Sequence, residues 1–182
     1  LPDATHLLGY VGSEMGDINL LVPFVSRART KHPSVRLALI GPRHRSKSLV
    51  DAEARGDAIN FGDVPFSRLS THLGACDAFV LPLRDTVFNR TRWPNKFGDY
   101  LAAGRPILSS PVGDVANIVL EERCGIVWRD LQELGDAFDQ FVDDESSSAE
   151  MAQRARQVAE GRLSWRTLTQ RFVDVYQRLP RG

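Results

Sequence analysis

Short apolar segments alternate with longer amphipathic segments along the first 128 residues of the chain. The short segments have the composition of buried strands. The segment "DAFVLPL" (77–83) is apolar almost throughout, which is typical of an interior parallel strand. We predict strands at 6–12, 35–41, 58–64, 77–83, 106–110 and 124–128. We predict the intervening helices at 18–30, 47–56, 65–76, 94–103 and 114–123.

After Trp128 the pattern is helical only. It predicts three further helices, at 130–144, 147–161 and 163–179. Ser164 is the expected N-cap of the last helix. We expect Trp165 and Phe172 on that helix to make core contacts.

The alternation of about six strands with helices predicts an α/β fold. We expect a doubly wound, mostly parallel, six-stranded Rossmann-like sheet with a C-terminal helical extension. The 182 residues fit a single domain over 1–182, with its sheet part at about 5–128 and its helical tail at about 130–179. The sequence begins at Leu1 rather than at methionine, which favours a domain excised from a longer protein.

The carboxyl edge of the predicted sheet is where a doubly wound fold binds its ligands. The glycine turn after Val11, the turn after Ser110 and the start of the helix 94–103 all lie at that edge. The connection "RDTVFNRTRW" (84–93) lies there as well and is predicted to be irregular. It is long for a connection within a compact domain, which indicates a function.

The helix 94–103 opens with residues suited to binding a phosphate. Pro94 at the first helical position fixes φ and leaves the amides that follow it pointing outward. Those amides and the helix dipole form an anion site, to which Lys96 adds a full charge. Asp99 follows one turn later, and a carboxylate accepts hydrogen bonds from both vicinal hydroxyls of a ribose. Together these features predict a pocket for a ribonucleoside diphosphate.

A purely structural interpretation also fits these residues. Lys96 and Asp99 are three positions apart and match a solvated helix ion pair, which contributes about 0.2–0.5 kcal/mol. The run from Ala102 to Gly104 equally fits close packing followed by a C-terminal glycine. The chemistry of the segment alone leaves both interpretations open.

The overall composition excludes several classes of protein. Lys+Arg (23) equals Asp+Glu (23), so no global field draws the chain to nucleic acid or to an anionic membrane. No apolar run reaches the roughly 18–20 residues of a membrane span, and no signal peptide is visible. Cys76 and Cys124 match no metal-ligand spacing and are expected as free buried thiols. The four histidines are scattered and form no metal or catalytic set.

The segment "PNKFGDYLAAGRPILSSPVGDV" (94–115) carries a family resemblance. It resembles "PNKLFEYMAAGKPVIAS–VGG" in the C-terminal domain of retaining GT-B glycosyltransferases of family 4, or group 1. "GYVG" (9–12) and "LALIGP" (37–42) are similar to the first two strands of that domain. The segment 59–83 resembles "V.FLG.VP...L...L...D..VLP", and 164–179 resembles the family's terminal helix. The likeness covers nearly the whole chain, and 94–106 is its most specific part.

The resemblance implies roles in donor binding for four residues. Asp99 stands where the family has its second motif glutamate, the ribose-binding carboxylate, and it is one methylene shorter. Asn95 and Lys96 fall where the helix start cradles the diphosphate, and Lys96 is the expected catalytic cation. Val64 falls where a backbone contact to the nucleobase is usual.

The phosphate-facing turn after the first strand departs from the family pattern. Gly12 and Ser13 fall at this turn and are expected donor contacts. The arginine and lysine that often follow the glycine are replaced by "SEMGD" (13–17). The compensating charge is expected from Lys96 and Arg90, with Arg92 and Arg43 as further candidates.

The sugar-binding part of the pattern departs as well. Many family members have a glutamate eight residues before the second one, and Thr91 occupies that position here. Asp85 or Asn89 in the long connection is expected to take over sugar recognition. Both residues equally fit a turn.

The implied reaction is transfer of a sugar from a nucleoside diphosphate donor, with retention of configuration. Lys96 and the helix amides would stabilise the charge that develops on the leaving diphosphate. We expect no metal, no other cofactor and no nucleic-acid partner. The acceptor (a sugar, a lipid-linked sugar or a small molecule) is expected on an N-terminal domain absent from this sequence, so this domain alone should be inactive. We expect a cytoplasmic location, with any attachment to the inner membrane made through the missing domain.

Two alternatives belong to other functional classes. Thr91 and the missing cations also fit a non-catalytic nucleotide-sugar-binding or regulatory module of a glycosyltransferase complex. A dinucleotide-binding oxidoreductase is disfavoured, because "GYVGSEMG" (9–16) lacks the G-x-G-x-x-G spacing.

Overall fold

A single parallel sheet forms the centre of the fold. The computed structural model describes residues 6–12, 17–42 and 46–179. The strand order is β3-β2-β1-β4-β5-β6, and every neighbouring pair is parallel, which confirms the predicted doubly wound sheet. The strands are β1 (Leu7–Val11), β2 (Arg36–Ile40), β3 (Ala58–Gly62), β4 (Ala78–Leu81), β5 (Ile107–Ser109) and β6 (Gly125–Val127).

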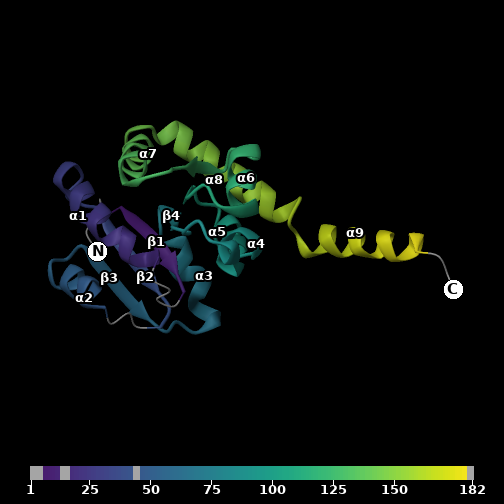
Figure 1. Cartoon of the computed structure of the whole chain (residues 1–182), viewed down its shortest axis with the longest axis horizontal. Helices are drawn as coiled ribbons and strands as arrows, with labels where there is room; N and C mark the ends of the chain where they lie inside the picture. Colours follow the sequence, from purple (N-terminus) through teal and green to yellow (C-terminus); the bar gives the residue numbers. More distant parts are fainter. Residues whose placement is uncertain (1–5, 13–16, 43–45, 180–182) are drawn as a thin grey trace.

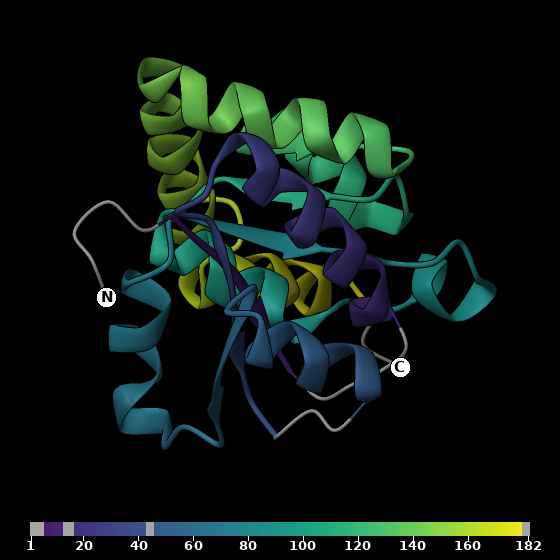
Figure 2. The same ribbon diagram turned by 90° about the vertical axis from the view of Figure 1, so that its left-hand side faces the viewer.

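Helices connect the strands and cover both faces of the sheet, as Figures 1 and 2 show. Between the strands lie the 3-10 helix η1 (Asp17–Leu20), α1 (Leu21–Lys31), α2 (Lys47–Ala54), α3 (Phe66–Gly74), α4 (Val87–Thr91), α5 (Asn95–Ala103) and α6 (Gly113–Glu121). After β6 follow α7 (Leu131–Asp143), α8 (Glu145–Glu160) and α9 (Trp165–Arg178).

Each face of the sheet has its own hydrophobic core. Side chains of α1, α2 and α7 form one core, and side chains of α3, α5, α6 and α8 form the other. Successive residues of a strand point to opposite faces. In β1, Leu8 and Tyr10 therefore belong to the first core and Leu7 to the second. Cys76 and Cys124 are buried free thiols in the second core, as predicted.

The connection 84–93 differs from its predicted irregular form, because it contains the short helix α4. Thr86 caps this helix by accepting a hydrogen bond from the amide of Asn89. The backbone of α4 also packs closely on Gly113, where an added Cβ would lie 3.1 Å from the carbonyl oxygen of Asn89. A local cap and a close glycine contact thus order a segment that carries no helical periodicity.

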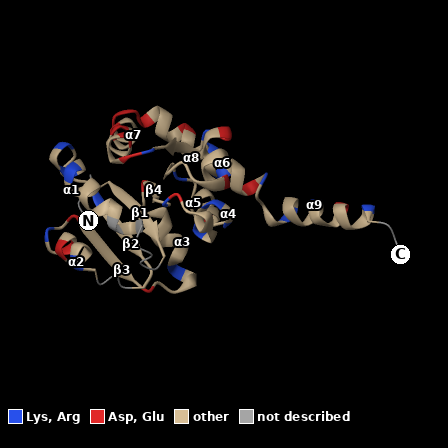
Figure 3. Cartoon of the chain, viewed as in Figure 1, with Lys and Arg blue, Asp and Glu red and all other residues tan. Residues whose placement is uncertain are grey.

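The last helix corrects a second prediction. Trp165 and Phe172 are 85% and 66% exposed, and no described residue of α9 is buried. The helix projects from the body of the domain (Figure 1), so its apolar side chains have no core to enter. Its charged residues are Arg166, Arg171, Asp174 and Arg178, and Figure 3 shows charged positions of both signs along the helix. Ser164 is its N-cap, as predicted, and accepts a hydrogen bond from the amide of Thr167 at 3.2 Å.

None of the helices in the described part of the chain is both long and apolar enough to cross a membrane.

Candidate functional site

The strand order places a topological switch point between β1 and β4. From β1 the chain first builds outward to β2 and β3, and then returns to add β4, β5 and β6 on the other side. A crevice opens at the carboxyl ends of the two central strands of such a sheet and is the usual ligand site. The segments that leave β1 and β4 border this crevice.

Gly12 follows β1 at the crevice and has a φ of 125°, a conformation that favours glycine. Its amide donates a hydrogen bond to the carbonyl of Ile40 at 2.9 Å. Gly41 follows β2 in a similar conformation, and an added Cβ there would lie 2.9 Å from the carbonyl oxygen of Gly12. Two glycine turns therefore pack against each other beside the switch point.

Helix α5 begins one residue later than predicted, with Pro94 as its N-cap. The carbonyl of Pro94 accepts a hydrogen bond from the amide of Phe97 at 2.9 Å, which closes the first turn. Proline has no side-chain oxygen with which to cap the amides that follow. Asn95 is exposed, and among the described residues none accepts a hydrogen bond from its amide. This helix start has the donors and the dipole of an anion site.

Lys96 brings a positive charge to the end of β1. Its Nζ lies 3.9 Å from the centroid of the Tyr10 ring. A Cβ added to Gly12 would lie only 3.0 Å from the same Nζ. Two of the predicted site residues, Gly12 and Lys96, are therefore in close proximity, although they are far apart in the sequence.

Tyr100 fixes α5 against β1, and the sequence analysis did not identify it. Its hydroxyl accepts a hydrogen bond from the amide of Val11 at 2.8 Å. Its ring stacks on Phe79 of β4, with 4.1 Å between the ring centroids. Burial raises the pKa of the Tyr100 phenol well above its ordinary value, so the group stays protonated. The only sequence feature that could have indicated this role is the position of Tyr100, one helical turn after Lys96.

Asp99 lines a cavity of about 880 Å³ between α5 and the start of α9. Asn95 lines the same cavity, and so do the aromatic side chains of Trp93 and Trp165. Partial burial raises the pKa of the Asp99 carboxyl above its ordinary value of 3.8. No residue in the described part of the chain donates a hydrogen bond to this carboxylate or forms an ion pair with it. The solvated Lys96–Asp99 pair considered above is therefore not formed.

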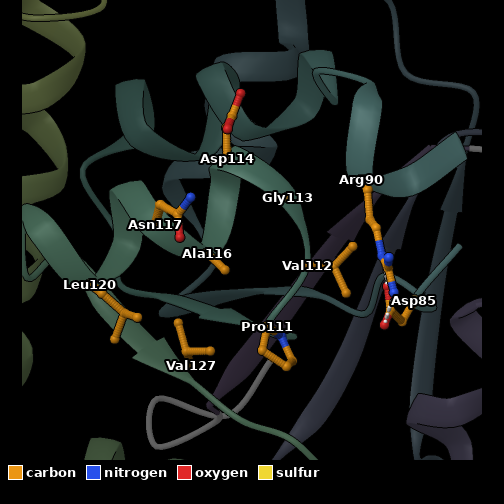
Figure 4. Close-up of a pocket in the computed structure, with 10 residues that line it drawn as sticks. All are labelled: Asp85, Arg90, Pro111, Val112, Gly113, Asp114, Ala116, Asn117, Leu120 and Val127. Atoms are coloured by element: carbon orange, nitrogen blue, oxygen red, sulfur yellow. Dashed lines mark hydrogen bonds and ion pairs between the residues drawn. The ribbon is translucent and has the colours of Figure 1, made fainter. Parts of the chain in front are cut away.

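Asp85 and Arg90 lie together at a second cavity, of about 490 Å³, beside the start of α6 (Figure 4). The Nη2 of Arg90 donates to Asp85 at 2.6 Å, and its Nε donates to the other carboxylate oxygen. The Arg90 guanidinium lowers the pKa of the Asp85 carboxyl. Apolar side chains of Val112 and Leu120 line the same cavity.

The side chain of Asn89 is buried within the segment that precedes α5. Its Nδ2 donates to the carbonyl of Arg84 at 2.9 Å, and its Oδ1 accepts from the Nε of Arg92 at 2.8 Å. The Arg92 guanidinium also lies over the Phe88 ring. Thr91 is exposed, and its hydroxyl donates to the carbonyl of Val87. These bonds hold the segment in shape.

The other predicted residues have different surroundings. Val64 follows β3 and packs, partly buried, against the second core. Ser13 and Arg43 lie outside the described residues. Ser110 is buried, and its hydroxyl accepts from the amide of Leu83 and donates to the carbonyl of the same residue, both at 2.8 Å. This arrangement ties the end of β5 to the segment after β4.

Within the described ranges, no three histidine, cysteine or carboxylate side chains are grouped so that they could hold a metal ion.

The fold and the site together define a class of protein: a doubly wound α/β domain with an uncapped helix start and a lysine at its switch point. The family model described as "Glycosyl transferases group 1" matches residues 5–144. The chain therefore belongs to the group 1 glycosyl transferases, which confirms the resemblance to the C-terminal domain of the GT-B enzymes.

Several known proteins are similar to this chain. A glycogen synthase of Mycobacterium tuberculosis is 25% identical over 162 residues, which are 86% of this chain and 38% of that enzyme. The structure of Anabaena HepE in complex with UDP superposes with a TM-score of 0.78 at 15% identity, covering 96% of this chain and 49% of that one. The C-terminal domain of the Francisella tularensis group 1 protein LpcC superposes with a TM-score of 0.73 at 12% identity, covering 91% and 89%.

The chain thus spans less than half of the glycogen synthase and about half of HepE. It matches nearly the whole of the LpcC domain.

Proposed function

We propose that this chain is the donor-binding domain of a retaining glycosyltransferase and that it binds a nucleoside diphosphate sugar. One observation carries the proposal: at the switch point, α5 begins beside the end of β1, with Lys96 against Gly12 and Asp99 in the adjoining cavity. Membership of the group 1 glycosyl transferases supports the class of reaction.

The costly event in glycosyl transfer is the departure of the nucleoside diphosphate from the anomeric carbon. Negative charge grows on the leaving phosphate during this step. Preorganised donors and cations at that position stabilise the charge, because they need no reorganisation as the reaction proceeds. Here the amides at the start of α5 and the Lys96 ammonium would act in this way. Gly12 and Ser13 would complete the phosphate-facing side.

Asp99 would bind the ribose of the donor. Its carboxylate needs hydrogen-bond donors, and two vicinal hydroxyls supply them. The volume of the cavity beside it, about 880 Å³, is within the usual range of small-molecule sites. Asn95 would contact the diphosphate from the same helix start. The backbone at Val64 would contact the nucleobase at the far end.

Uridine is the nucleoside that we propose. The related structures of HepE were solved with UDP, with UDP and glucose, and with UDP-glucose. The α5 start and Asp99 recognise only the diphosphate and the pentose, so they do not by themselves select a base. The choice of uridine therefore depends on the structural likeness.

We assign donor-sugar recognition to Asp85 and the role of a second phosphate cation to Arg90. Asp85 and Arg90 now neutralise each other at the cavity in Figure 4. A donor phosphate would compete with Asp85 for the guanidinium and would release the carboxylate toward sugar hydroxyls. Asn89 would contribute through the shape of the segment, because its side-chain amide is already bonded.

A second domain would hold the acceptor and complete the active site. The exposed apolar side chains of α9 support this arrangement, since a helix with no buried residue needs a partner surface. The length of HepE, about twice that of this chain, supports it as well. This domain by itself would bind the donor and transfer nothing.

The alternative is a non-catalytic nucleotide-sugar-binding module, and Thr91 favours it. A threonine whose hydroxyl is bonded to the carbonyl of Val87 cannot replace the carboxylate that many family members place there. Transfer of sugar, or hydrolysis of the donor, by the complete polypeptide would decide against the alternative.

The experiment that tests donor binding is titration calorimetry of this chain with UDP, GDP and TDP in parallel. We expect UDP to bind and to bind more tightly than the other two nucleotides. Binding of GDP or TDP in preference to UDP would overturn the uridine assignment alone. Failure of all three to bind would overturn the proposed function.

A further inference from the structure

Lys96 and Tyr10 approach each other from opposite faces of the sheet. Tyr10 belongs to the core formed with α1 and α7, and it is 3% exposed. Lys96 comes from α5, whose buried residues Phe97 and Tyr100 belong to the core on the other face. The lysine side chain must therefore cross the carboxyl edge of the sheet to reach the ring.

Gly12 is the residue that the lysine passes. A Cβ at this position would lie 3.0 Å from Nζ and 3.4 Å from Cε of Lys96. The first distance is tighter than ordinary van der Waals contact, so a side chain here would shift the ammonium. The left-handed φ of Gly12 favours glycine, and glycine has no side chain. The turn therefore leaves room for the Lys96 ammonium to pass over it.

The ring face of Tyr10 is suited to hold the ammonium. An aromatic face attracts a cation within about 6 Å of its centroid, and Nζ lies at 3.9 Å. A lysine stem is flexible and has many rotamers, so a contact at its end restricts where the charge lies. The ring is buried in the core, so its own freedom to move is small.

We infer that Tyr10 is a positioning residue for Lys96. Its ring holds the ammonium over the carboxyl end of β1, beside the start of α5, where the donor diphosphate would lie. The role of the contact in catalysis rests on the proposed function. The contact between the Tyr10 ring and the Lys96 ammonium does not depend on that function. The ring face is the operative group, so phenylalanine at position 10 should serve and an aliphatic residue should not.

The contact can be tested by NMR without any ligand. The chain has three lysines, and reductive ¹³C-methylation labels each while keeping its charge. Lys31 and Lys47 are exposed and paired with carboxylates, so their methyl signals should lie at ordinary shifts.

The Lys96 signal, identified by its loss in Lys96→Arg, should be displaced upfield by the ring current of Tyr10. The displacement should persist in Tyr10→Phe and vanish in Tyr10→Leu. An ordinary shift for Lys96 in the unsubstituted protein would overturn the inference.

The consequence for the reaction needs the complete enzyme. Tyr10→Leu should lower kcat about fivefold with KM changed less than about twofold, and Tyr10→Phe should keep kcat within about twofold of the original. Adding Tyr10→Leu to Lys96→Ala should cost nothing further, because the ring then has no ammonium to hold. Melting temperatures of all variants identify any that do not fold.

The outcomes separate this inference from the proposed function. Full kcat in Tyr10→Leu would overturn the positioning role. An equal further loss of kcat when Tyr10→Leu is added to Lys96→Ala would also overturn it, since the effects of two residues that act independently on kcat add. An unsubstituted chain that binds no nucleotide in calorimetry would overturn the proposed function instead. The NMR shift of Lys96 would still report whether the ring holds it.

Discussion

Lys96 and Asp99 show how two neighbouring residues of one helix come to different surroundings. Three residues along an α-helix differ by about 60° in direction once a full turn is subtracted. That difference turns Lys96 toward the end of β1 and Asp99 toward the cavity at α9. One helix start can therefore present a cation to a diphosphate and an acid to the adjoining pentose.

Asp99→Ala should weaken UDP binding by this chain about tenfold, which corresponds to one charge-assisted hydrogen bond. Titration calorimetry measures the change, and Glu150→Ala, an exposed residue of α8, is the matched control. Hydroxyls donate to the ionised carboxylate, whose pKa is raised by burial. Affinity should therefore fall on acidification at a higher pH than for an ordinary aspartate. Equal affinity of Asp99→Ala and the control would remove the ribose role.

Lys96→Ala in the complete enzyme should lower kcat about 10²- to 10³-fold and change donor affinity only modestly. The reason is that the ammonium would act mainly on charge that develops in the transition state. Steady-state kinetics separates the two effects, with the exposed Lys47→Ala as a control that should leave both unchanged. A turnover number unchanged in Lys96→Ala would exclude the residue from the mechanism.

At the scale of elements, α5 is the part whose placement matters most. Its second half is held at two places: the Tyr100 hydroxyl accepts a hydrogen bond from the amide of Val11, and Gly104 ends the helix in the left-handed conformation. Arg156 of α8 also donates to the carbonyl of Ala102 in the last turn. The helix is thereby fixed against β1 and α8, and a fixed helix is a requirement for a preorganised anion site at its start.

Tyr100→Phe should lower the free energy of unfolding by about 1–3 kcal/mol, because it leaves the partly buried amide of Val11 without its acceptor. Urea denaturation gives the value. Tyr176→Phe, on the exposed face of α9, is the matched control and should change stability by less than about 0.5 kcal/mol. Equal stability of the two variants would show that the Tyr100 hydroxyl does not hold α5.

Helix α9 should contribute little to the stability of this chain. Phe172→Ser on α9 should change the free energy of unfolding by less than about 0.5 kcal/mol, since the side chain is 66% exposed. Phe97→Ala on α5 should cost about 3–5 kcal/mol, because its ring is fully buried. A comparable loss in both variants, again by urea denaturation, would mean that α9 packs on the body of the domain.

At the scale of the whole molecule, the proposed donor site lies at one edge of the sheet, and α9 projects from the body of the domain (Figure 1). In the described residues α9 has no buried side chain, so its apolar side chains are exposed. With equal numbers of acidic and basic side chains, the molecule has no long-range field to attract a donor. Under the proposed function, recognition of the donor would come from short-range groups at the switch point, where Lys96 and the α5 amides lie.

Much of this organisation could be predicted from local sequence. Strands and helices follow from the period of apolar residues, and the strand–helix alternation implies a parallel sheet with its ligands at one edge. Pro94 and Gly104 mark the ends of α5 through backbone preferences that need no tertiary contact. Helix α4 was missed because its cap at Thr86 and its contact with Gly113 produce no periodicity. The exposure of Trp165 was missed because an amphipathic pattern shows that a face is apolar and not what covers it.

The sequence by itself determined the elements, their order and the chemical groups at the sheet edge, since these depend on neighbours along the chain. Only the tertiary structure decided the partners of those groups. It directed Lys96 past Gly12 to the Tyr10 ring and placed Asp99 in a cavity lined by Trp165. Such contacts join residues that lie far apart or on different elements, so they are fixed by how helices pack on the sheet rather than by any local preference.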